Sequence, residues 1–267
     1  MGGAGTTWWG EFPVGRSDVR FWQVGPLRLW ITRSDGEWRL AFLGGDDSMD
    51  ATLDVNEPVR EEDVDPAAAV VRFGFRKPGE SVRILPALPD RHLVVNPVTP
   101  FYVPSGERIT LYVSAPLWMS LWAGDPRRKI REIPTFRPTD TWFGPSTRVG
   151  EVCYASKTGA RMELESLPRR PHRAVVVVTV INRAVSQLPL EKLKLPMPNL
   201  SLFASEDGRL WTEGITLTRQ EDGEQAAVTL DADPPAQAGD AVRVGDARLR
   251  VERGHLIRAF GHILDFM

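Results

Sequence analysis

The stretch LRLWITRSDGEWRLAF, residues 27–42, decides the fold class. Two runs rich in apolar and aromatic residues, 27–33 and 37–42, flank the tripeptide Ser34-Asp35-Gly36. An Asp-Gly pair between two such runs predicts a tight β-hairpin, because glycine readily adopts the positive φ that these turns demand. We therefore predict two antiparallel strands joined at this point.

Similar turn signals recur along the chain. Asp207-Gly208, Asp222-Gly223 and Gly245-Asp246 each separate strand-like runs, and no long helical period lies between them. Short strands with turns about every dozen residues are typical of sandwiches and barrels. The run AVVVVTVI, residues 174–181, is apolar on both faces, which predicts a central strand covered on both sides. We predict an all-β protein built as an antiparallel β-sandwich.

Two segments, 91–118 and 173–211, resemble each other. Each begins with a basic residue followed by a strand-like run, and each ends in a second strand-like run that is flanked by small residues and followed by Leu-Trp. This similarity leaves two readings open, a duplicated β unit or unrelated strands with the same packing needs. We predict an N-terminal β unit over residues 1–125, with an acidic insertion at 44–66, and a second β unit over 126–253. The two would then be related sandwich units.

The segment 254–267 carries apolar residues at helical spacing. Leu256, Phe260, Ile263, Leu264 and Met267 fall at positions i, i+4, i+7, i+8 and i+11. This period predicts a short C-terminal helix that packs on the β core.

The acidic insertion partly imitates a calcium-binding loop. Its oxygen-bearing residues occupy the six ligand positions of the twelve-residue EF-hand pattern; they are Asp46, Ser48, Asp50, Thr52, Asp54 and Glu57. Ala51 stands at the position that requires glycine, and Pro58 discourages the helix that should follow. We predict an exposed acidic loop without a specific calcium site.

Composition excludes several functions. The chain of 267 residues has a formal net charge of -2, so no global basic field indicates nucleic-acid binding. A single cysteine, Cys153, fits a reducing compartment, and we expect a buried, inert thiol. The sequence shows no secretory signal and no apolar run near the ~20 residues that span a bilayer, so we expect a cytoplasmic protein. Histidine and cysteine spacing predicts no metal site. The sequence has no GxxxxGK(S/T) loop and no GxGxxG turn, and we predict no cofactor.

The segment RPTDTWFGPSTRVGEVCY, residues 137–154, is the candidate site. Prolines and a glycine surround an aromatic residue, which indicates a stiff loop, and such loops on rigid scaffolds often carry function. Most of the nine tryptophans should lie in the core, whereas one in this loop could meet a ligand. The candidate ligand-binding residues are Asp140, Thr141, Trp142, Arg148 and Glu151.

These observations support three hypotheses. The first is a non-enzymatic binding or regulatory module that recognises a protein or a small ligand through residues 138–154. The second is a hydrolase-type enzyme whose carboxylate and histidine assemble only in the fold, with Asp90, Asp140 and Glu151 as the carboxylates to examine. The third is a carbohydrate-binding module that uses exposed tryptophans. The sequence does not reveal the oligomeric state.

Several stretches resemble a known family. They are residues 86–97, LYVSAPLW (111–118), TDTWFGPSTRVGEVCYAS (139–156), LKLPMPNLSLF (193–203) and RLWTE (209–213). Together they resemble the uncharacterised prokaryotic proteins of domain of unknown function 432, over about residues 30–217. The resemblance implies a mostly β protein without an established activity. It also implies a membrane-linked protein partner, because such proteins are associated with genes for small mechanosensitive channels.

Overall fold

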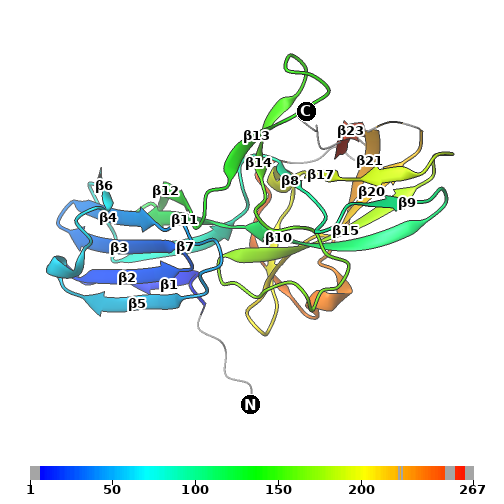
Figure 1. The fold of residues 1–267 in the computed structure, drawn as a ribbon. Coiled ribbons are helices and arrows are strands. Elements are labelled where there is room, and N and C mark those ends of the chain that lie inside the picture. The colour runs from blue at the N-terminus through cyan, green and yellow to red at the C-terminus, as the bar shows by residue number, and fades with distance from the viewer. Residues whose placement is uncertain (1–6, 222, 224, 250–255, 262–267) are drawn as a thin grey trace. The chain divides into compact units, whose positions relative to one another are not determined.

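The structure, a computed structural model, describes residues 7–221, 223, 225–249 and 256–261 (Figure 1). The described residues form strands and short 3-10 turns with no α-helix among them, which confirms the predicted all-β class. None of the described segments is a helix long and apolar enough to cross a membrane. The 3-10 turns are η1 (Glu61–Asp63), η2 (Met197–Asn199) and η3 (Ala236–Ala238).

The chain divides into two compact units, each assembled from separate stretches. Unit 1 comprises residues 1–87, 116–137 and 169–172, and unit 2 comprises 88–115, 138–168 and 173–267. The units therefore interleave along the sequence, whereas the predicted halves, 1–125 and 126–253, are contiguous. That each predicted half is a folding unit stays a prediction.

Unit 1 contains two antiparallel sheets. The first has the order β5 (Leu53–Val59), β2 (Val19–Val24), β3 (Leu27–Ser34), β4 (Glu37–Gly44) and β6 (Ala69–Gly74). The second has the order β1 (Gly10–Pro13), β7 (Ser81–Ala87), β11 (Trp118–Ala123) and β12 (Arg128–Pro134). The predicted hairpin is confirmed: β3 and β4 meet at Asp35-Gly36, where Gly36 has a φ of 80°.

Tryptophans occupy the core, as predicted. The buried tryptophans are Trp8, Trp22, Trp30, Trp38, Trp118 and Trp211. In unit 1 the Trp22 ring contacts Phe12 edge to face, with 5.4 Å between the ring centroids, and this contact joins β2 to β1. The indole N–H of Trp38 donates to the carbonyl of Pro78 at 2.6 Å, so its polar atom is satisfied inside the core.

Unit 2 contains a mixed sheet that curls into a half-barrel. Its order is β22 (Val242–Gly245), β18 (Leu202–Ala204), β19 (Leu210–Thr212), β15 (Arg173–Asn182), β20 (Ile215–Arg219), β21 (Gln225–Leu230) and β23 (Leu256–Arg258), and β10 (Arg108–Pro116) also pairs with β15. A two-stranded sheet joins β16 (Leu188–Leu190) to β9 (Phe101–Val103).

A second mixed sheet of unit 2 carries the candidate site, and we name it the hairpin sheet. Its order is β13 (Thr139–Phe143), β14 (Glu151–Ala155), β8 (Leu93–Val95), β17 (Lys192–Leu195) and β24 (Phe260–Gly261).

The prediction of purely antiparallel pairing is wrong for unit 2. β15 pairs in parallel with both β19 and β20, and β14 pairs in parallel with β8. The apolar run of β15 is buried along almost its whole length, so its predicted central position is confirmed. Strands that are apolar on both faces are typical of parallel pairing, a signal that the sequence carried.

The predicted C-terminal helix is wrong for the residues that the structure describes. Leu256–Arg258 form β23, which pairs with β21, and Phe260–Gly261 form β24, which pairs with β17. Leu256 and Phe260 thus lie on two short strands in two different sheets, although their spacing of four residues matches one face of a helix. The spacing alone did not reveal that the chain passes from one sheet to the other between them. Ile263, Leu264 and Met267 lie outside the described residues.

The acidic segment 44–66 is not wholly a loop. Its central part forms β5, which pairs with β2 along the edge of the first sheet of unit 1. Asp47 and Asp50 shape the turns before this strand, because their carboxylates accept the backbone N–H groups of Met49 and Thr52, each at 2.8 Å.

Candidate functional site

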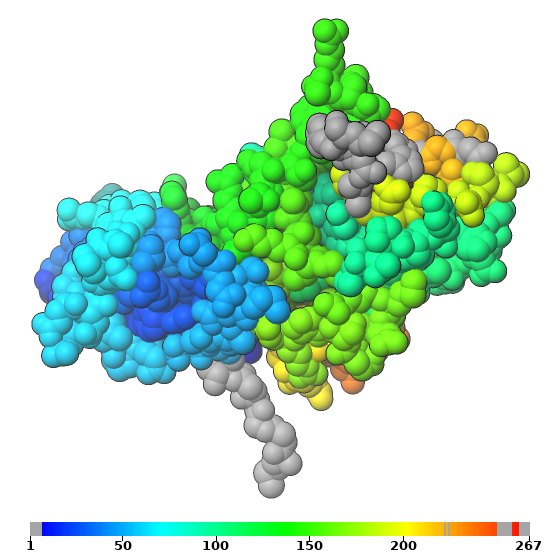
Figure 2. Space-filling model, in the orientation of Figure 1, coloured from blue at the N-terminus to red at the C-terminus, as the bar shows by residue number. Residues whose placement is uncertain are grey.

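The candidate segment 138–154 forms a β-hairpin rather than a stiff loop. β13 and β14 pair antiparallel from Thr139 opposite Ala155 to Phe143 opposite Glu151. Threonine, aromatic residues and valine favour strands, so only the connection 144–150 keeps the character that its proline and glycines suggested. The tip of the hairpin projects beyond the sheet to which it belongs (Figures 1 and 2).

Two glycines close the base of the hairpin tip. A Cβ atom on Gly144 would lie 2.1 Å from the carbonyl oxygen of Val149, and one on Gly150 would lie 2.7 Å from that of Phe143. The two legs of the connection approach so closely that larger residues would force them apart. The tip is therefore fixed at its base by backbone packing.

Trp142 is exposed and yet held in place. Its relative exposure is 45%, while its indole N–H donates to the carbonyl of Ser146 at 2.7 Å. The hydroxyl of Ser146 accepts the backbone N–H groups of Arg148 and Val149, at 3.3 and 3.2 Å. The ring is thus oriented by the tip itself, and its apolar surface remains in contact with solvent.

Alternation along the strands divides the predicted site residues between two faces. Trp142 lies opposite Val152, so these two side chains share a face, which we name the Trp142 face. Asp140 belongs to the same face, whereas Thr141 and Glu151 point to the other side, the Glu151 face. The five predicted residues therefore do not converge on one spot, and Arg148 lies in the exposed tip.

The Trp142 face combines apolar and ionic groups. Val152 is 47% exposed, and Val149 in the tip is 62% exposed. Near the root of the hairpin, the Arg91 guanidinium lies 3.2 Å from the Asp140 carboxylate and over the ring of Tyr154. Charged groups thus border exposed apolar side chains on a projecting element.

The Glu151 face contains a nearly buried lysine. The Lys194 side chain is 6% exposed, its ammonium pairs with the Glu151 carboxylate, and it lies 5.5 Å from the centroid of the Phe143 ring. The other carboxylate oxygen of Glu151 is 3.5 Å from Nε2 of His92. A buried ammonium requires a partner, and the Glu151 carboxylate supplies one to Lys194.

The same surroundings shift two pKa values. Burial lowers the pKa of His92, with the Lys194 charge adding to the effect and the Glu151 charge opposing it. Burial, reinforced by Glu151, raises the pKa of Cys153 to about 11. At neutral pH the imidazole is therefore neutral and the thiol protonated. Cys153 is fully buried, which agrees with the prediction of an inert thiol.

Within the residues that the structure describes, no group of three or more histidine, cysteine or acidic side chains is arranged to hold a metal ion.

The chain matches a family model described as "Protein of unknown function (DUF432)" over residues 8–267. The chain belongs to this family. The match confirms the resemblance noted over residues 30–217 and extends it in both directions. No match was found among curated proteins or among solved structures.

Residues outside the predicted set complete the site of this DUF432 chain. Arg91 and His92 immediately precede β8, and Lys194 comes from β17, the neighbour of β8. Sequence reasoning missed these three residues because they are far from the hairpin along the chain. Only the pairing of β14 with β8 and of β8 with β17 brings them near the hairpin. Val149 carried a local signal, since a valine between Arg148 and Gly150 in a short turn has no core to enter.

Proposed function

We propose that the protein is a non-enzymatic binding or regulatory module that recognises a protein partner through the hairpin 138–154. The observation that carries the proposal is the Trp142 ring, which is 45% exposed while its indole N–H is already bonded to Ser146. Tryptophan is enriched among the residues that dominate binding energy in interfaces, and an oriented ring loses little conformational freedom on binding.

The shape of the site supports a protein over a small molecule. Small-molecule sites are concave, whereas this hairpin projects from its sheet (Figure 2). Val149 and Val152 supply apolar area next to the ring, and the Arg91–Asp140 pair supplies a polar rim. An apolar centre with a polar border is the usual arrangement of an interface.

The proposal extends to the scaffold and the setting. The contact of Phe12 with Trp22 between the two sheets of unit 1 supports a sandwich arrangement there. A cytoplasmic location and a membrane-linked partner are proposed from the sequence and the family resemblance alone.

Site-specific photo-crosslinking tests the proposal. A photoreactive amino acid replaces Val149 in the full chain, and crosslinking is carried out in native cells before the membranes are solubilised. The control places the same residue at Val185, which is 88% exposed in another loop of unit 2. We expect a partner that crosslinks to position 149 only and is lost in the Trp142→Ala background. Identical products at both positions, or products indifferent to Trp142→Ala, contradict the proposal.

A carbohydrate-binding module is the second candidate, because the exposed Trp142 ring lies on one face with the charged Asp140–Arg91 pair. Calorimetry of the full chain with oligosaccharides tests it directly. Saturable binding that Trp142→Ala abolishes would favour this candidate over the protein-binding one.

A further inference from the structure

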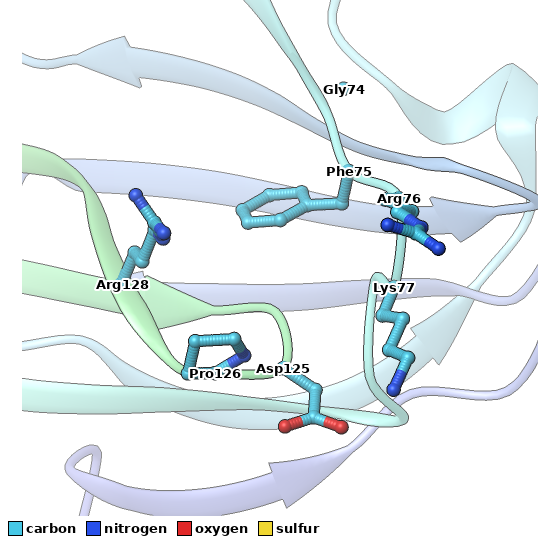
Figure 3. A pocket seen from close by; sticks show the side chains of 7 residues that line it. All are labelled: Gly74, Phe75, Arg76, Lys77, Asp125, Pro126 and Arg128. Atoms are coloured by element: carbon cyan, nitrogen blue, oxygen red, sulfur yellow. The ribbon is translucent and has the colours of Figure 1, made fainter.

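A cavity of about 550 Å³ lies in unit 1, and it is independent of the function proposed for the hairpin. Its walls come from two turns, one immediately after β6 and one between β11 and β12 (Figure 3). The first turn contributes Phe75, Arg76 and Lys77, the second contributes Asp125, and Arg128 is the first residue of β12. We name it the cationic cavity. Its volume is in the range of sites for small organic ligands.

Backbone hydrogen bonds fix the two turns to each other. The N–H of Asp125 donates to the carbonyl of Lys77 at 3.0 Å, and the N–H of Gly124 donates to that of Pro78 at 3.1 Å. A Cβ atom on Gly124 would lie 2.4 Å from the Phe75 ring, so glycine at this position lets the ring pack against the second turn. The cavity is therefore formed before any ligand arrives, which reduces the entropy lost on binding.

The charges around the cavity are unbalanced. Arg76, Lys77 and Arg128 face one carboxylate, that of Asp125. Within the described part of the chain, none of these three cations lies in an ion pair.

Two neighbouring cations of the turn and of β12 are neutralised. Arg127 pairs with Glu11, and Lys129 pairs with Glu132. The protein as a whole has a formal net charge of -2, so the excess positive charge at this cavity does not follow from the overall charge of the chain. Uncompensated guanidinium groups at a cavity favour an anionic ligand, and their planar fork fits the oxygens of a phosphate.

An aromatic ring lies among these cations. Phe75 is half-buried, and Figure 3 shows its ring between Arg128 on one side and Arg76 and Lys77 on the other. A flat apolar face beside phosphate-binding groups suits a ligand that carries both a planar ring and a phosphate, because a base stacks on an aromatic side chain whatever its identity. We propose that the cationic cavity binds a soluble nucleotide, with the base on Phe75 and the phosphate between the cations.

Calorimetry of the full chain tests this proposal. The probes are adenosine 5′-monophosphate and guanosine 5′-monophosphate, compared with adenosine, which lacks the phosphate, and inorganic phosphate, which lacks the ring. We expect each nucleotide to bind at least about ten-fold more tightly than adenosine or phosphate, and the affinity to fall as salt is added. Ribose 5-phosphate and vesicles that contain a phosphoinositide are further arms.

Variants identify the site. Arg76→Ala and Arg128→Ala should each weaken nucleotide binding about ten-fold or more, while Phe75→Leu should weaken nucleotide but not phosphate binding. Asp125→Asn should tighten nucleotide binding several-fold, because it removes the one carboxylate of the cavity. Lys129→Ala is the matched control, since that cation pairs with Glu132 and does not line the cavity. Its affinity should equal that of the native chain.

Several outcomes would overturn the proposal. These are no binding at millimolar nucleotide, affinities unchanged by Arg76→Ala and Arg128→Ala, or ribose 5-phosphate binding as tightly as the nucleotides. Binding to the phosphoinositide vesicles alone would assign the cavity to a lipid headgroup. Near-ultraviolet circular dichroism of each variant confirms that a lost affinity does not reflect unfolding.

Discussion

At the residue scale, Trp142 differs from the other tryptophans of the chain. Its ring is 45% exposed, whereas Trp38 is fully buried and also carries a bonded indole N–H. Trp142→Ala should reduce the free energy of unfolding by about 1 kcal/mol or less, the net value of one hydrogen bond. Trp38→Ala, the control, should cost about 3–5 kcal/mol through the cavity it leaves. Urea titrations of both variants measure the difference, and equal losses would remove the argument for a recognition role of Trp142.

His92 gives the stability a testable pH dependence. Because burial lowers the pKa of His92, the folded protein binds a proton at this site less readily than the unfolded chain, whose histidine has a pKa of about 6.5. The contribution of His92 to the free energy of unfolding is therefore fully present above about pH 6.5, and it decreases as the pH falls below that value. The difference in unfolding free energy between the native chain and His92→Gln, measured from pH 7.5 to 5, isolates the effect. A native chain that gains stability relative to the variant on acidification would show that Glu151 dominates instead.

At the scale of elements, β24 is an edge strand of the hairpin sheet. Phe260 is 2% exposed and lies opposite Leu193 of β17. Phe260→Ala should cost about 3–5 kcal/mol in urea unfolding, because the ring leaves a cavity in the core. Tyr102→Ala is the control, since this aromatic residue of β9 is 61% exposed and its loss should stay within about 0.5 kcal/mol. Equal effects would mean that β24 does not pack as the structure describes.

The acidic segment should not bind calcium specifically. Of the six positions of the EF-hand pattern, Asp54 and Glu57 lie in β5, where the extended chain cannot wrap round an ion. Asp50 is already engaged, because hydrogen bonds from the hydroxyl and N–H of Thr52 lower its pKa. Calorimetry with Ca²⁺ should show no saturable binding near micromolar concentration. Saturable binding that Glu57→Gln abolishes would contradict this expectation.

Local patterns predicted some elements and not others. Leu27–Ser34 and Glu37–Gly44 followed from two apolar, aromatic-rich runs around an Asp-Gly turn, because both signals lie within a few residues. Phe260 was wrongly assigned to a helix, because its four-residue spacing from Leu256 matches a helical period although the two residues lie on different strands. Trp142 was predicted to lie in a loop and lies in β13, whereas Lys194 was missed because it reaches Glu151, 43 residues away in the sequence, only through the pairing of β14 with β8 and of β8 with β17. Pairing between distant strands is a property of the whole fold and leaves no local signal.

At the scale of the whole molecule, unit 1 depends on residues far along the chain. The carbonyl of Pro171 accepts the indole N–H of Trp8 at 2.8 Å, and the carbonyl of His172 accepts the N–H of Leu117 at 3.0 Å. The His172 ring is fully buried, and a Cβ atom on Gly25 would lie 2.2 Å from it. An N-terminal half that stops at residue 125 lacks residues 169–172 and the contacts they make with unit 1.

Two fragments test this dependence against the division predicted from the sequence. The fragment 1–125 lacks β12 and residues 169–172, whereas the fragment 1–175 contains every stretch of unit 1. Because Trp8, Trp22 and Trp38 are buried in unit 1, their near-ultraviolet circular dichroism reports its packing. We expect a native-like signal and a cooperative urea transition only in the fragment 1–175. The fragment 1–125 lacks the β11–β12 pairing and the His172 ring, so apolar surface that is buried in the full chain would be exposed to solvent. A cooperative transition in 1–125 would instead establish the contiguous half as a folding unit, and the interleaved stretches would then be later additions to a core already formed.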